Sequence, residues 1–258
     1  MERLVTRRQE GLTAAGLRKF GLVFLLAGIC SRAILQNKVL GMASGGTEQL
    51  MALFDANPDM MGVAALALVL QALETCAAPI FAFLLVEGFS HPAQSKDYFL
   101  KIIGVALAAE IPYNLAMGGK LLDLSGRNPA FGLVFGYIMM HYFCRYSDKG
   151  FKNVLTKVLI AAAAIVWCMM LNIEYGACII LLVASFWMGR NKPNLRTLFG
   201  CSGAVICTAF SMFFLASPMA LMAVHFYNGE PGEQSEFMRY WTYPAVLLLV
   251  GIGATMLL

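Results

Sequence analysis

The stretch from Pro79 to Gly136 is PIFAFLLVEGFSHPAQSKDYFLKIIGVALAAEIPYNLAMGGKLLDLSGRNPAFGLVFG, and it sets Glu87 and Glu110 inside apolar runs. A charged side chain at the centre of a membrane-spanning helix costs about 2.5–3.5 kcal/mol on insertion scales, and such residues mark functional sites by default. The stretch therefore predicts membrane-spanning helices that carry a polar site between them.

The composition is that of a membrane protein. Hydrophobic residues make up 59% of the 258 residues and charged residues 13%, whereas soluble domains are typically about 45–50% apolar and about 25% charged. We expect one transmembrane domain over residues 1–258, with a short basic cytoplasmic segment at 1–18. The net charge of +4 does not indicate a nucleic-acid partner, because the basic residues fall in short loops between apolar runs.

The apolar runs predict an all-α, polytopic transmembrane helix bundle of about eight spans, with about eight to ten allowed, since each span needs about 20 apolar residues. The expected spans are residues 19–36, 60–89, 98–117, 130–146, 154–171, 174–189, 197–227 and 239–258. Two of them are too long for one straight helix and contain Pro79 and Pro218, at which a break or a short extra helix is expected.

The distribution of Lys and Arg predicts the orientation. Most of these 19 residues fall on the side of the N-terminus, which places both termini in the cytoplasm under the positive-inside rule. The acidic loop around Glu230, Glu233 and Glu236 is then expected on the outer side. The sequence thus predicts a multi-pass protein of the cytoplasmic (inner) membrane, with membrane lipid as its surroundings.

Polar residues inside the apolar runs are the first candidates for a site. Glu87 and His91 are four residues apart and would share a helix face, although a solvated helix end is an equal explanation. Glu110 lies about twelve residues into its span, followed by Pro112, with Asn114 one turn further on. Two roles would explain a glutamate at position 110. It either lines a polar pocket or forms a hydrogen bond that ties two helices together.

Two polar turns add further candidates. The turn before the fourth span contains Asp123, Ser125 and Asn128. These residues either form part of the site or cap the helix. Glu174 and Tyr175 lie in the tight turn before the sixth span, where a helix-start acid is also expected. We expect one polar cavity to collect Glu87, His91, Glu110, Asn114, Asp123 and Asn128. The sequence contains no metal-ligand spacing, so no metal site is predicted.

The ordered motifs of this chain resemble those of a known family. PIFAFLLVEGFSH, DYFLKI, EIPYNLA, LDLSGRNPAFGLVFG, IEYGACIILLV, FYNGEPG and YWTYP occur in that order and are similar to motifs of the TraX family, named for a conjugative pilus protein that acetylates the pilin N-terminus. The resemblance implies a bacterial inner-membrane acyltransferase. Such an enzyme passes an acetyl or other acyl group from cytoplasmic acetyl-CoA or acyl-CoA to an acceptor hydroxyl or amine.

The chain departs from the family pattern at positions that matter for catalysis. An Asp-His pair in the first span, whose histidine would be the base, aligns with Gly28 and Ile29, and a second histidine aligns with Val246. Thr75 replaces an arginine, and Asn114 replaces an aspartate. The remaining catalytic candidates are His91, Glu87 and Glu110. The candidates for substrate binding are Asn114, Asp123, Ser125, Asn128, Glu174 and Tyr175.

Three functions remain open from the sequence. The first is a working acyltransferase in which one of the remaining candidates is the base. The second is a catalytically silent relative that binds a lipid, an acyl-CoA or a partner membrane protein. The third is a small-solute transporter whose pathway is lined by Glu110, Asn114 and Glu174, although alternating-access transporters usually carry internal repeats and the sequence shows none.

Overall fold

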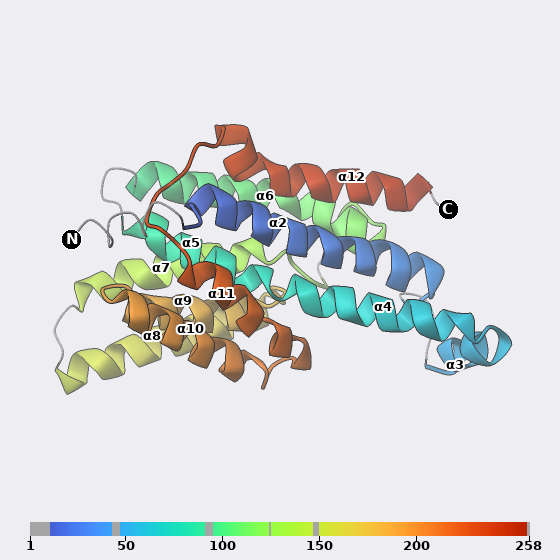
Figure 1. Cartoon of the computed structure of the whole chain (residues 1–258), viewed down its shortest axis with the longest axis horizontal. Helices are drawn as coiled ribbons and strands as arrows, with labels where there is room; N and C mark the ends of the chain where they lie inside the picture. The colour runs from blue at the N-terminus through green and yellow to red at the C-terminus, as the bar shows by residue number, and fades with distance from the viewer. Residues whose placement is uncertain (1–10, 43–46, 91–94, 124, 147–149, 257–258) are drawn as a thin grey trace.

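Long apolar runs form the helices of this protein, and polar turns end them. The computed structural model describes residues 11–42, 47–90, 95–123, 125–146 and 150–256. These residues form an all-α bundle of roughly antiparallel helices (Figure 1), which confirms the predicted fold class. In the described part of the chain, four helices are long and apolar enough to cross a membrane: Ala14–Val39, Asp59–Phe89, Asp97–Gly118 and Phe151–Met170.

The first half of the chain supplies the longest helices. Helix α2 (Ala14–Cys30) continues directly into the π-helical segment η1 (Ser31–Val39). A short helix, α3 (Thr47–Ala56), precedes α4 (Asp59–Glu74) and α5 (Ala77–Phe89), and α6 (Ser95–Gly118) follows. Helix α3 is a short connecting helix that lies at one extremity of the bundle (Figure 1).

The second half forms a group of shorter helices. They are α7 (Ala130–Arg145), α8 (Phe151–Met170), α9 (Gly176–Gly189), α10 (Pro193–Cys207), η3 (Met212–Ala216), α11 (Pro218–His225), η4 (Phe237–Trp241) and α12 (Thr242–Met256). Most side chains of α9 are buried, and most of those on α8 are exposed. Helix α9 is therefore the centre of this group, whereas α8 presents an apolar face to the surroundings.

The expected break in the second span lies just before Pro79. Helix α4 ends at Glu74 and α5 begins at Ala77. Pro79 then falls in the first turn of α5, where its missing N–H removes no intrahelical hydrogen bond. The break leaves the last residue of α4, Glu74, inside the bundle with 3% of its surface exposed.

The segment expected as one span at residues 197–227 is a helical hairpin. Thr197 Oγ1, near the start of α10, lies 3.4 Å from Nδ1 of His225, the last residue of α11. The backbone N–H of Leu12 donates to the carbonyl oxygen of Phe226 at 2.8 Å, beside the first described residues. We call the end of the bundle where Leu12 lies the amino-terminal end.

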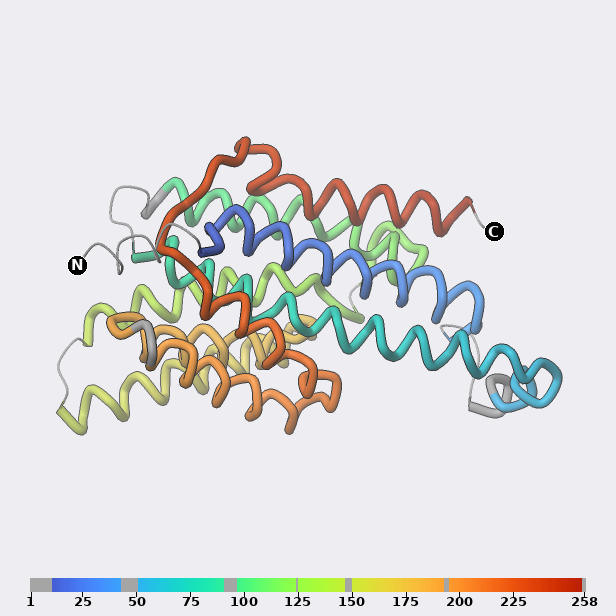
Figure 2. The backbone as a smooth tube through the Cα atoms, viewed as in Figure 1, coloured from blue at the N-terminus to red at the C-terminus, as the bar shows by residue number. Residues whose placement is uncertain are grey.

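This hairpin changes the topology that follows it. The backbone N–H of Ala14 donates to Glu230 O at 2.9 Å, and Lys101 of α6 forms an ion pair with Glu236. The acidic loop therefore lies at the amino-terminal end of the bundle, and not at the opposite end as expected. Figures 1 and 2 show the start of α2 and the end of α12 at opposite ends of the bundle. The arrangement therefore differs from the expected one, in which both termini share a side.

Labelling of single cysteines tests this arrangement. Glu233 lies in the acidic loop and Lys120 follows α6 at the other end, and both are exposed. In a Cys144→Ser background, which removes the exposed native thiol, a membrane-impermeant maleimide should reach Glu233→Cys and Lys120→Cys from opposite sides of sealed vesicles. Labelling of both from the same side would contradict the topology.

Candidate functional site

Four polar side chains from four different elements meet inside the bundle. We call them the Arg32 cluster: Arg32 of η1, Glu74 of α4, Tyr113 of α6 and Glu174 of the turn before α9. One guanidinium nitrogen of Arg32 donates to Glu74 Oε1 at 2.5 Å, and another donates to Glu174 Oε1. The Tyr113 hydroxyl donates to Glu174 Oε2. One arginine therefore joins segments that are far apart in the sequence.

The cluster leaves one carboxylate oxygen open. Both oxygens of Glu174 accept hydrogen bonds, whereas Glu74 Oε2 is buried and has no partner within the described part of the chain. The Glu74 side chain is only 2% exposed. Two carboxylates around one guanidinium also leave an excess of one negative charge, which is costly to bury. An open, buried acceptor of this kind calls for a ligand, a proton or a water molecule.

Gly28 makes the space that Glu74 occupies. A Cβ atom at position 28 would lie less than 3.0 Å from the Cβ, Cγ and Oε2 atoms of Glu74, closer than two such side chains can approach. The family resemblance expects an aspartate at this position of α2. In this chain the carboxylate at the same place comes from α4 instead.

A strained turn holds Glu174 in place. Asn172 and Tyr175 have φ angles of 50° and 54°, a left-handed conformation that is uncommon for residues other than glycine. The turn is pinned to the segment before α7, because the N–H of Arg127 donates to Asn172 O at 2.9 Å and the N–H of Glu174 donates to Arg127 O at 3.0 Å. These bonds offset the strain and fix the direction of the Glu174 side chain.

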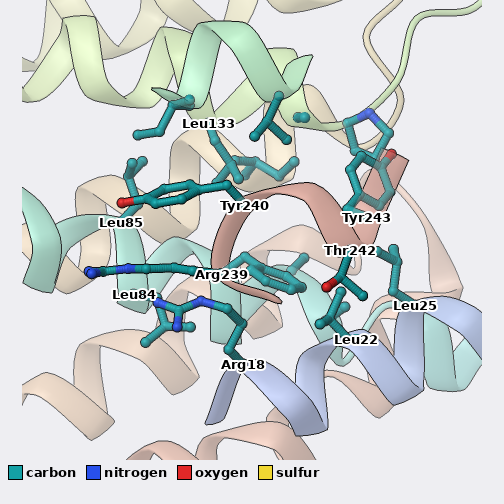
Figure 3. Close-up of a pocket in the computed structure, with 18 of the residues that line it drawn as sticks. Arg18, Leu22, Leu25, Leu84, Leu85, Leu133, Arg239, Tyr240, Thr242 and Tyr243 are labelled. Atoms are coloured by element: carbon teal, nitrogen blue, oxygen red, sulfur yellow. The ribbon is translucent and has the colours of Figure 1, made fainter. Parts of the chain in front are cut away.

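A cavity of about 150 Å³ extends between α2, α5, α6, α7 and α12 (Figure 3). Glu74, Thr75, Tyr175 and Tyr243 line its wall beside the Arg32 cluster. Leucines and other apolar side chains line its middle, among them Leu22, Leu25, Leu84, Leu85 and Leu133. The cavity therefore joins the open carboxylate of Glu74 to a largely apolar channel.

Two arginines and two tyrosines line the other end of the cavity. We call Arg18, Tyr98, Arg239 and Tyr240 the basic mouth. A second hollow of about 270 Å³ shares Tyr98, Arg239 and Tyr240 with the cavity and includes the exposed Lys101. The mouth therefore adjoins the protein surface at the amino-terminal end.

The arginines of the basic mouth lack carboxylate partners. Arg18 donates to the amide oxygen of Gln234, and Arg239 Nε is buried without a hydrogen-bond partner. Within the described residues neither arginine forms an ion pair with a carboxylate. In Figure 3 the guanidinium groups of Arg18 and Arg239 point away from Tyr243. Asp97 and Glu236 line the adjoining hollow together with Arg239 but pair with neither arginine. Two neighbouring guanidinium groups that are not paired with carboxylates suit a phosphate-bearing ligand.

The structure brings Glu110 and Asn128 together, as expected. Asn128 Nδ2 donates to Glu110 Oε2 at 2.6 Å, and the backbone N–H of Asn128 and the side chain of Arg127 donate to the same carboxylate at 3.3 Å. Asn128 Oδ1 also accepts from the N–H of Ala130 at 3.0 Å, at the start of α7. Glu110 is thus fully paired, and it ties α6 to α7 rather than facing the cavity.

The expectation of one common polar cavity is wrong, because the cavity lining contains none of the expected members that the structure describes: Glu87, Glu110, Asn114, Asp123 and Asn128. Glu87 lies at the amino-terminal end, where it accepts from the hydroxyl of Tyr227 at 3.4 Å. Asp123 accepts from the N–H of the exposed Ser125 at 2.9 Å, and this bond lowers the pKa of the Asp123 carboxyl. The contacts of Glu87 and Asp123 involve helix ends and loops, and neither residue belongs to the cavity lining.

The other candidates have mixed positions. Tyr175 lines the cavity and Glu174 belongs to the Arg32 cluster, so the turn between α8 and α9 lies beside the cavity. Asn114 is buried on α6, whose helix continues through Pro112 without a break. His91 lies outside the described residues.

Sequence reasoning missed Arg32 and Glu74. The signal that singled out Glu110, a charge inside a membrane-length apolar run, applies equally to Glu74 in LQALETCAAP. Arg32 likewise stands within an apolar run, in the helix Ala14–Val39. Two opposite charges in neighbouring spans predict an ion pair, because a buried charge needs a partner.

The fold and the buried cluster define an integral membrane protein of the helical-bundle class. The family model described as TraX protein matches residues 38–252, and the chain belongs to the TraX family. Neither the curated proteins nor the solved structures contain a match to the chain.

The contact between Gly28 and Glu74 gives a first test. Gly28→Ala should destabilise the protein by about 1–3 kcal/mol, because the added methyl group overpacks the site and must displace Glu74. Gly62→Ala on α4 is the matched control, since a Cβ there meets nothing within 4 Å. Thermal unfolding in detergent measures both. Equal stability of the two variants would contradict the packing described.

The ion pairs of Arg32 give a second test. Arg32→Met leaves Glu74 and Glu174 buried without their cation and should destabilise the protein by about 3–5 kcal/mol. The triple variant that adds Glu74→Gln and Glu174→Gln should recover most of the loss. Lys101→Met removes an exposed ion pair and should have little effect. Unfolding by denaturant measures each step, and an Arg32→Met variant as stable as Lys101→Met would contradict the account.

Proposed function

We propose that this protein is a membrane acyltransferase, which takes an acyl group from a cytoplasmic acyl-CoA and passes it to a hydroxyl or amine of an acceptor. The observation that carries the proposal is the single cavity that joins the basic mouth to Glu74. A thioester donor needs an anion site for its phosphates and an apolar passage for its acyl arm. It also needs a buried polar group where the bond changes occur.

The basic mouth has the chemistry for the phosphates of coenzyme A. Arg18 and Arg239 provide two guanidinium groups without carboxylate partners, and Tyr240 adds a hydroxyl beside them. Arginine binds phosphate in a bidentate manner. The proposed cytoplasmic donor then enters from the amino-terminal end, where the positive-inside rule also favours basic residues.

The size of the cavity favours a short acyl group. Its volume of about 150 Å³ is similar to that of an engineered cavity that holds a benzene-sized molecule. This volume covers the whole space from the basic mouth to Glu74, which must also take the thioester arm. Acetyl-CoA, which carries a small acyl group, is therefore the donor that we propose. The cavity walls consist mainly of leucine and other apolar side chains, which exclude water from the thioester.

A catalytically silent member of the family is the second candidate. Its supporting observation is that the described cavity lining contains no histidine. His141 and His225 are exposed and lie outside that lining. Such a protein would still bind the donor at the basic mouth, and it would act by binding lipid or assembling with another membrane protein. Binding and turnover of acetyl-CoA therefore need separate measurements.

Donor binding is tested by thermal stabilisation of the purified protein. A ligand stabilises the folded state by RT ln(1 + [L]/Kd), about 2.7 kcal/mol at a hundredfold excess over Kd. We expect acetyl-CoA to raise Tm, and Arg18→Gln or Arg239→Gln to weaken its binding about 10- to 100-fold, because each removes a charged hydrogen bond worth about 1.5–3 kcal/mol. Lys19→Gln, at an exposed neighbour of Arg18, is the matched control.

The outcomes separate the candidates. Stabilisation by acetyl-CoA together with release of free thiol supports the acyltransferase. Stabilisation without thiol release supports the silent relative. If acetyl-CoA does not stabilise the wild-type protein, or stabilises Arg18→Gln and Arg239→Gln as strongly as Lys19→Gln, the basic mouth is not a donor site.

A further inference from the structure

We propose that Glu74 is the catalytic residue that takes the proton from the acceptor hydroxyl or amine. The inference rests on the acyltransferase function proposed above and adds the identity of its base. It is carried by the open oxygen Oε2, which belongs to a buried side chain of the cavity wall.

The other buried or half-buried carboxylates have their hydrogen-bonding capacity filled or lie elsewhere. Both oxygens of Glu174 are bonded, to Arg32 and to Tyr113. Glu110 accepts from three donors of the Arg127–Asn128 segment. Glu87 contacts Tyr227 at the amino-terminal end. Among the described residues that line the cavity, Glu74 is the only carboxylate.

Arg32 orients Glu74 for this role. It holds Oε1 at 2.5 Å, which fixes the carboxylate plane and leaves Oε2 as the oxygen without a partner. Gly28 lies against Oε2, and a Cβ atom there would collide with it. The absence of a side chain on Gly28 therefore makes the room in which Oε2 lies against α2, and a base at this position must be reached by the acceptor from the cavity that Glu74 lines.

The charges of the cluster also suit the uptake of a proton. Arg32 carries one positive charge, and Glu74 and Glu174 together carry two negative charges. One added proton makes the cluster neutral, which lowers the cost of its burial. The titratable groups around Glu74 come from η1, α6, the turn before α9, and α12: Arg32, Tyr113, Glu174, Tyr175 and Tyr243.

The proposed step transfers an acyl group with balanced protons. The acceptor oxygen or nitrogen attacks the carbonyl carbon of the thioester, and its proton passes to Glu74 Oε2. The carbon–sulfur bond then breaks, and the leaving sulfur takes the proton from Glu74. The products are the acylated acceptor and the free thiol of coenzyme A, and the Glu74 carboxylate is restored.

The test compares two variants in vesicles of phosphatidylethanolamine and phosphatidylglycerol. Acetyl-CoA is the donor, n-butylamine or n-butanol is the added acceptor, and thiol release is the readout. Glu74→Gln should lower turnover about 10²–10⁴-fold, the usual contribution of a general base. Its Tm and its stabilisation by acetyl-CoA should persist, because glutamine keeps the oxygen that accepts from Arg32 and removes the excess charge. Glu87→Gln, outside the cavity lining, is the matched control and should retain turnover.

The outcomes distinguish this inference from the function on which it rests. Turnover in Glu74→Gln equal to that of the wild type overturns the assignment of Glu74 and leaves the acyltransferase intact. A wild-type protein that neither binds nor turns over acetyl-CoA overturns the proposed function and the role of Glu74 with it. Loss of turnover with retained donor binding in Glu74→Gln alone supports the inference.

Chemical labelling keeps the inference testable if Glu74→Gln does not fold. Dicyclohexylcarbodiimide modifies carboxyl groups in apolar surroundings when they take up a proton, as the base does in each cycle, and mass spectrometry identifies the modified residue. We expect labelling of Glu74 in the wild-type protein, loss of thiol release in parallel, and no labelling of the fully paired Glu110. Labelling of Glu110 in place of Glu74 would overturn the assignment.

Discussion

The ion pairs of Arg32 are the interaction on which the interior of this protein depends. Arg32 is brought into the bundle by the continuous run of α2 and η1, and it meets one carboxylate at the end of α4 and another before α9. A buried guanidinium needs carboxylate partners, and Arg32 has two, although its Nε is buried without a hydrogen-bond partner among the described residues. The end of α4 presents one of these partners, and the strained turn before α9 presents the other.

Two glutamates of the same chain show how pairing decides function. Glu110 receives three hydrogen bonds from the Arg127–Asn128 segment, so its carboxylate has a structural role and joins α6 to α7. Glu74 keeps one oxygen open beside a cavity. Glu110 and Glu74 therefore differ in the number of hydrogen-bond donors around the carboxylate. This number, and not the depth of the residue in the apolar run, distinguishes the structural residue from the candidate base.

Much of the fold was predictable because apolar length is a local property. The eight expected spans coincide with helices or helix pairs of the structure, and the breaks near Pro79 and Pro218 follow from the geometry of proline. The direction of the chain after residue 197 was not predictable in the same way. Helices α10 and α11 are each shorter than a usual span, so hydropathy alone merges them into one crossing.

The candidate site was only partly predictable, for a physical reason. Glu110 and Asn128 are close in the sequence, and their pairing followed from one polar turn. Arg32 meets Glu174 across 142 positions, and the space for Glu74 comes from a missing side chain at Gly28. Such long-range contacts can be identified only from the folded structure. The general signal of a functional residue, a charge inside an apolar run, did however apply to Glu74.

The central claim is that the cavity between the basic mouth and Glu74 receives the thioester donor. The most direct measurement is photocrosslinking with a short acyl-CoA analogue that carries a diazirine on its acyl group, with the adducts mapped by mass spectrometry. The account predicts adducts on the cavity lining, at Leu22, Phe81 or Leu133, which excess acetyl-CoA suppresses. Adducts confined to the outward-facing side chains of α8, such as Val158 and Trp167, would contradict it.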